Sequence, residues 1–151
     1  MPHQVSFWPI AGLMFATGIG IPILATFNAG LGAQLGSATG ATFVLFAVGL
    51  ALATLIVALV GLPERQLFTF ERPHLYFGAV FMLFYVLSVT FAAPRIGVGN
   101  AVFFVLLGQL IAAAAIDHFG LWGAMQAQIT VRRLTGIGVM ALGVYLARKP
   151  V

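Results

Sequence analysis

Charged residues and one uncharged glycine-rich segment divide this 151-residue chain into five apolar stretches, most of them near the length of a membrane-crossing helix. The hydrocarbon core of a bilayer is crossed by roughly 20 apolar residues in helix. The runs are continuous and do not alternate, which argues against the strands of a membrane barrel. We therefore predict an all-α fold, a single membrane domain over residues 1–151 that forms an integral helical bundle of five transmembrane helices. The expected spans cover residues of about 6–27, 38–62, 74–92, 97–116 and 131–147.

The composition points to lipid as the solvent for most of the chain. Apolar residues make up 62% of it and charged residues only 7%, whereas a soluble domain is about 45–50% apolar and about a quarter charged. A soluble fold of this length could not hide so much apolar surface, because much of any folded surface stays wet. We expect a multi-pass protein in contact with the lipid bilayer.

The basic residues do not indicate a nucleic-acid partner, although they raise the isoelectric point to about 10.4. There are seven of them against three acids, and they lie singly or in pairs between the apolar runs. A nucleic-acid interface needs a basic patch or stripe. We interpret these charges as determinants of topology and headgroup contact. The N-terminal apolar run exceeds the 7–15 residues typical of a signal peptide and lacks basic residues before it, so we expect it to be retained as a span.

Local breaks set the expected ends of the spans. Residues 28–37 are uncharged and glycine-rich, so we predict a loop there. Pro22 should kink the first span, and Pro94 should close the third. The fifth stretch, Leu134 to Ala147, covers only about 21 Å of helix at 1.5 Å per residue. It crosses the bilayer only if flanking arginines snorkel and the helix starts earlier, near Ile129; an interfacial helix is the alternative.

An odd number of spans places the two ends of the chain on opposite sides of the membrane. The side of the N-terminus then carries four basic residues and the other side three. A difference of one slightly favours a cytoplasmic N-terminus under the positive-inside rule and equally allows insertion in both orientations. Two copies in opposite orientation would form a 5+5 inverted repeat, which places a substrate site near the midplane. A homodimer, or pairing with a homologous half, is therefore the expected working unit.

Five polar residues are candidates for lining a substrate pathway. Gln109 lies in the middle of the fourth span, where its amide must either bond a neighbouring helix or face a solute. Asn100 lies nine positions earlier, on roughly the opposite face of that helix. Tyr85 and Ser88 share a face of the third span, where their hydroxyls could equally bond their own helix. Asn28 lies in the predicted loop, as a helix cap or as part of a gate.

Asp117 is the one carboxylate close to a span, at the end of the fourth. The helix dipole disfavours an anion at that end, so Arg132 or Arg133 on the same side should compensate it. The pair is either a structural link across the connector or a gate.

Metal, cofactor and catalytic chemistry are not expected. The chain has no cysteine and three histidines scattered along the sequence, which is not the pattern of a metal site. No Ser/His/Asp arrangement and no phosphate-binding loop is present, so we expect no enzyme and no cofactor.

Several segments resemble the YdcZ-type family of the drug/metabolite transporter (EamA-like) superfamily. They are Ala93-Pro94-Arg95-Ile96-Gly97, Gly108-Gln109, Asp117-His118-Phe119-Gly120, Arg133-Leu134-x-Gly136 and Asn28-Ala29-Gly30-Leu31. The chain departs from the family at Tyr76-Phe77-Gly78-Ala79, where members tend to carry tryptophan and paired glycines. The resemblance implies a five-helix exporter of the cell's inner (plasma) membrane, with ten-helix fused forms in some members. The membrane-embedded glutamate of the related small multidrug proteins has no counterpart, since no carboxylate lies inside a span.

Taken together, the sequence predicts a subunit of a secondary membrane transporter. We expect it to export a small amphipathic or hydrophobic solute by alternating access, as a dimer. A non-transporting membrane scaffold or accessory subunit is the alternative.

Overall fold

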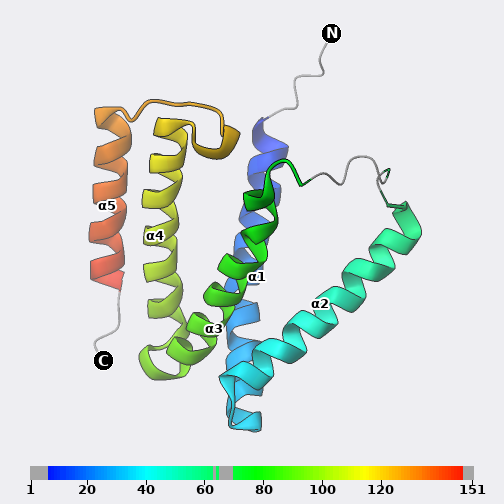
Figure 1. Ribbon diagram of the computed structural model, residues 1–151. Helices are drawn as coiled ribbons and strands as arrows, with labels where there is room; N and C mark the ends of the chain where they lie inside the picture. Colours follow the sequence, from blue (N-terminus) through cyan, green and yellow to red (C-terminus); the bar gives the residue numbers. More distant parts are fainter. Residues whose placement is uncertain (1–6, 63, 65–69, 148–151) are drawn as a thin grey trace. The chain divides into compact units, whose positions relative to one another are not determined.

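The computed structural model describes residues 7–62, 64 and 70–147, and every regular element among them is helical. The α-helices are α1 (Phe7–Leu35), α2 (Ala38–Val60), α3 (Gly78–Ile96), α4 (Val98–Phe119) and α5 (Val131–Ala147) (Figure 1). Two short 3₁₀ helices, η2 (Pro73–Phe77) and η3 (Leu121–Gly123), precede α3 and follow α4. The prediction of an all-helical membrane fold is confirmed for this part of the chain.

Four of these helical stretches are long and apolar enough to cross a membrane: α1, α2, η2 with α3, and α4. The fifth helix is shorter, with 17 residues, or roughly 26 Å at 1.5 Å per residue. It begins at Val131, three residues before Leu134, so the helix starts earlier than the apolar run, as expected, and matches the predicted range 131–147. Crossing of the bilayer by α5 therefore stays a prediction that depends on snorkelling side chains at its ends.

The chain divides into two compact units, residues 1–95 and 96–151. In the described part of the first unit, α1 and α2 diverge from a tight turn, and α3 follows (Figure 1). In the second unit, α4 and α5 lie side by side and are joined through η3 (Figure 1). This division does not test the single membrane domain expected over residues 1–151, which stays a prediction.

The predicted glycine-rich loop is wrong, because α1 continues through Asn28 to Leu35. In lipid the backbone must satisfy its own hydrogen bonds, so an uncharged stretch of small residues stays helical. The turn is reduced to Gly36, whose φ of +62° is a left-handed conformation that favours glycine, and Ser37. The Ser37 hydroxyl accepts a hydrogen bond from the Gly40 amide at 3.0 Å and caps α2.

Pro94 does not close the third span as predicted, since α3 continues for two more residues to Ile96. The break comes instead at Gly97, directly after the helix, with φ of +85°. Pro22 lies inside a continuous α1. Its carbonyl accepts a hydrogen bond from the Thr26 hydroxyl at 2.8 Å.

The buried residues of the first unit are small. They come from α1, α2 and α3, which allows the helix backbones to approach closely. They are Ala25, Asn28, Ala29, Ala41, Thr42, Val86, Val89, Thr90 and Ala93. Most large apolar side chains point outwards instead; Phe27, for example, is 74% exposed. Such a surface is stable only against lipid or another apolar partner.

Candidate functional site

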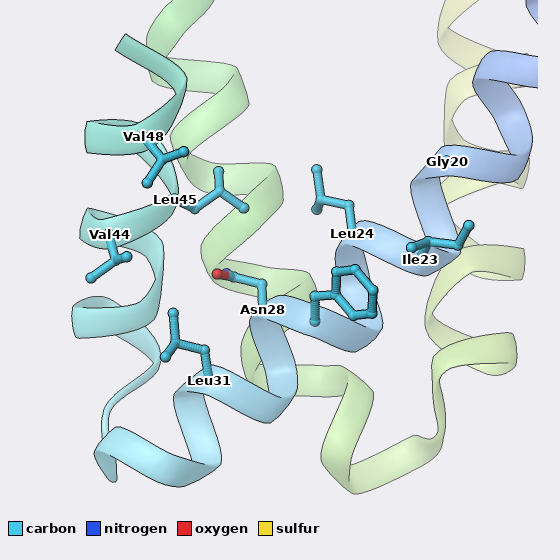
Figure 2. Close-up of a pocket in the computed structure, with 9 residues that line it drawn as sticks. Gly20, Ile23, Leu24, Asn28, Leu31, Val44, Leu45 and Val48 are labelled. Atoms are coloured by element: carbon cyan, nitrogen blue, oxygen red, sulfur yellow. The ribbon is translucent and has the colours of Figure 1, made fainter. Parts of the chain in front are cut away.

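A groove of about 440 Å³ lies between α1 and α2 (Figure 2). Asn28 is the one polar side chain among the residues that line it, which are Gly20, Ile23, Leu24, Phe27, Asn28, Leu31, Val44, Leu45 and Val48. The α1 residues recur every three or four positions and so share one face of that helix. The groove is open to its surroundings and carries no charged side chain.

Asn28 is fixed by a neighbouring helix. Its Nδ2 donates a hydrogen bond of 2.6 Å to Oγ1 of Thr90 on α3, and the two residues are 3% and 4% exposed. The predicted position of Asn28 in a loop is therefore wrong, because the residue lies within α1; its place in a substrate pathway stays a prediction. An amide carries two donors and an acceptor with two lone pairs. One such bond leaves capacity for a further partner in the groove.

Sequence reasoning missed Thr90. It lies in the third span among other hydroxyl residues, and its spacing from Tyr85 and Ser88 gave no reason to single it out. What distinguishes Thr90 from the other hydroxyl residues of α3 is its position where α3 approaches α1. A Cβ added at Gly32 would lie 3.3 Å from the Thr90 methyl group.

A second hollow, of about 300 Å³, lies where α1, α2 and α3 approach one another. It is lined by Ala29, Gly32, Ala33, Gly36, Ser37, Ala38, Thr90, Phe91, Pro94 and Arg95. Its α1 residues lie on roughly the opposite face of the helix from those of the groove. Because Asn28 lines the groove and Thr90 lines the second hollow, the hydrogen-bonded pair stands between the two.

Arg95 is the charged residue of the second hollow. One of its Nη atoms donates a hydrogen bond to the Phe91 carbonyl, and its guanidinium lies 3.6 Å from the centre of the Phe91 ring. Both contacts are within α3, so they orient the cation without neutralising it. Within the described ranges, no carboxylate lies within ion-pair distance of Arg95.

Tyr85 and Ser88, predicted to share a lining face, differ in environment. Ser88 is exposed, and the Tyr85 hydroxyl is buried without a hydrogen-bond partner among the described residues. Neither residue lines the groove or the second hollow. The Thr42 hydroxyl is likewise buried without a partner there, beside a third hollow of about 260 Å³ between α2 and α3.

In the second unit, Asn100 and Gln109 point to different surroundings. Asn100 is 7% exposed, and its Nδ2 donates to the Ile96 carbonyl at 2.8 Å. Gln109 is exposed on the surface of α4. The structure does not bring these two side chains together, as their nine-residue separation predicted.

Asp117 pairs with Arg133. The carboxylate Oδ2 lies 2.6 Å from Arg133 Nη2, and the two side chains are 36% and 34% exposed. Arg132 is exposed. The connector folds back on the end of α4, where the Asp117 carbonyl accepts from the Ala127 amide at 2.8 Å and His118 Nδ1 accepts from the Ile129 amide at 3.2 Å. The ion pair therefore belongs to a folded connector between α4 and α5.

Metal-binding residues do not gather in the part of the chain that the structure describes. No group of three His, Asp or Glu side chains there could hold a metal ion.

Residues 9–146 match the family described as "Putative inner membrane exporter, YdcZ". No curated protein matches the chain. No solved structure matches it either.

Proposed function

Because the chain belongs to the YdcZ family of inner-membrane exporters, we propose that it is one half of a secondary transporter that exports a small amphipathic or hydrophobic solute. Its membership supports a transporter of the inner membrane rather than an enzyme. The solute class, the dimer and the alternating-access mechanism are the proposal.

The observation that carries the proposal is the groove between α1 and α2. It is apolar and open, and it holds a single polar anchor at Asn28. Binding sites for small molecules combine apolar walls with a few placed polar groups. A solute with an apolar body and one hydrogen-bonding group fits such a lining, whereas a multiply charged solute does not.

The exposed apolar surface of the first unit supports a dimer. The groove between α1 and α2 is open, and much of the apolar surface of these helices is exposed. A second copy in opposite orientation would cover apolar surface of this kind and complete a 5+5 inverted repeat. Rocking of one half against the other would then expose the groove to each side in turn.

Reconstitution in liposomes tests the proposal. The purified protein would be inserted into vesicles loaded with a panel of small amphipathic solutes, with and without a pH gradient. We expect efflux of at least one solute above protein-free vesicles. A correctly folded dimer that moves none of them would favour the scaffold function.

A further inference from the structure

The second hollow is a cavity lined by one cation, Arg95, for which the described residues provide no acidic partner. Arg95 lines the hollow, and the part of the chain that the structure describes places no carboxylate within ion-pair distance of its guanidinium. A charge near or within a bilayer is costly unless it is hydrated, paired or used. Arginine binds phosphate and carboxylate groups through a planar fork of N–H donors.

The guanidinium is oriented before any ligand arrives. Its hydrogen bond to the Phe91 carbonyl and its stacking on the Phe91 ring use one donor and one face. Arginine has five N–H donors, so the others are available to an anion. Phe91 and Arg95 both line the hollow.

The size and lining of the hollow restrict what can enter. Its volume of about 300 Å³ corresponds to roughly ten water molecules at about 30 Å³ each. This volume holds a headgroup but not a long alkyl chain, so the alkyl chain of the ligand would have to extend out of the open side of the hollow. The other lining residues are small or apolar, apart from the hydroxyls of Ser37 and Thr90. The α2 N-terminus at Ser37 and Ala38 adds further partial positive charge.

We infer that the second hollow binds the anionic headgroup of an amphiphile, a phosphate or carboxylate, through Arg95. This inference goes beyond the proposed function, which places the transported solute in the groove between α1 and α2. Headgroup binding in the second hollow needs no transport. The ligand is then either a soluble amphipathic anion or an anionic lipid, which share this chemistry.

Binding to dodecyl phosphate in nanodiscs of zwitterionic lipid tests the inference, with empty nanodiscs subtracted. We expect saturable binding by the wild-type protein and weaker binding of dodecyltrimethylammonium and dodecanol. Arg95→Gln should weaken dodecyl phosphate binding at least about tenfold, because a charge-assisted bond is lost. Arg95→Lys should bind dodecyl phosphate with an affinity between those of the wild type and Arg95→Gln, since lysine keeps the charge and loses the planar set of N–H donors.

Arg72→Gln is the matched control, because Arg72 is exposed in the connector before η2 and outside the hollow. It should bind as the wild type does. The hydrogen bond and the ring contact of Arg95 both lie within its own helix, so its variants should elute from size exclusion as folded protein. Equal binding by wild type and Arg95→Gln, or equal affinity for the cationic amphiphile, would overturn the inference.

Anionic lipid distinguishes the two sources of the headgroup. If phosphatidylglycerol added to the nanodiscs displaces dodecyl phosphate, the hollow is a lipid-headgroup site; if it does not, the ligand is a soluble amphiphile. Both results support the anion site. Headgroup binding without flux of any solute would contradict the proposed function alone, and solute flux without binding of dodecyl phosphate would contradict the anion site alone.

Discussion

Asn28 on α1 and Thr90 on α3 are joined by a hydrogen bond of 2.6 Å, although 62 positions separate them in the sequence. Both side chains are almost completely buried. The bond attaches the third helix to the first at the point where the groove and the second hollow approach each other. It gives the first unit both a structural link and a polar anchor.

Thr90→Val should destabilise the protein, because it removes the acceptor and leaves the Asn28 amide buried. Hydrogen bonds between membrane helices contribute about 0.6 kcal/mol on average and up to about 1.7 kcal/mol. We expect a loss within this range in the free energy of unfolding, measured by titration with SDS and followed by circular dichroism.

Thr17→Val is the control, because the Thr17 hydroxyl bonds the Leu13 carbonyl of its own helix and is exposed. It should leave the unfolding curve nearly unchanged. In the double variant with Asn28→Leu, the two losses should not add, since the residues act through one bond. Additive losses would show that the bond contributes nothing.

Gly32→Leu should disrupt the packing of α3 against α1. Even a Cβ at Gly32 would lie 3.3 Å from the Thr90 methyl group and 3.7 Å from Ala38 and Ala41. Overpacking of this kind costs about 1–3 kcal/mol. The melting temperature in detergent would measure the loss. Gly30→Leu is the matched control, because nothing lies within 4 Å of its added Cβ, and a similar fall for both variants would contradict the packing described.

The sequence was informative about the helices because lipid imposes a simple rule. A continuous apolar run must be helical, so the residue types alone located the helices. The same rule explains the error at residues 28–37, where glycines typical of a loop in water remain helical to Leu35. Pro94 misled for a related reason, since α3 continues past it to Ile96.

The candidate site was only partly predictable. Asn28 and Asp117 stood out as polar groups in or near apolar runs, and the structure gives each of them a partner. The sequence narrowed the partner of Asp117 to Arg132 or Arg133, whereas the partner of Asn28 depends on helix packing that periodicity does not encode. Thr90 and the second hollow could therefore not be identified from the sequence. The sequence predicts Arg95 only as a contact for lipid headgroups, and the structure shows that it lines a cavity.

Asp117→Asn should have a small effect on stability. Both partners of the Asp117–Arg133 ion pair are about one third exposed, and such pairs contribute about 0.2–1 kcal/mol. We expect a loss in that range for Asp117→Asn and for Arg133→Gln, with no further loss in the double variant. Arg132→Gln should resemble wild type. Solute flux should persist in all of them, and flux abolished by Asp117→Asn in a normally inserted protein would assign the pair to a gate.

Glu71→Cys tests the inverted pair. The chain has no cysteine, so a single thiol at this exposed position can be labelled without background. If copies insert in both orientations, an impermeant maleimide should label about half of the protein in intact spheroplasts and all of it after permeabilisation. Labelling of none or all in intact spheroplasts would show a single orientation, and the partner would then have to be a different chain.

The groove is the centre of the proposed transport pathway, and filling it is the most direct test. Gly20 lines the groove and has open space where its Cβ would lie, so Gly20→Phe should fill the groove without unfolding the protein. Gly12 on the same helix is equally open and lies outside the groove. In liposomes that transport a solute, Gly20→Phe should reduce the initial flux at least tenfold, while Gly12→Phe should match wild type. Equal flux for all three proteins would contradict transport through this groove.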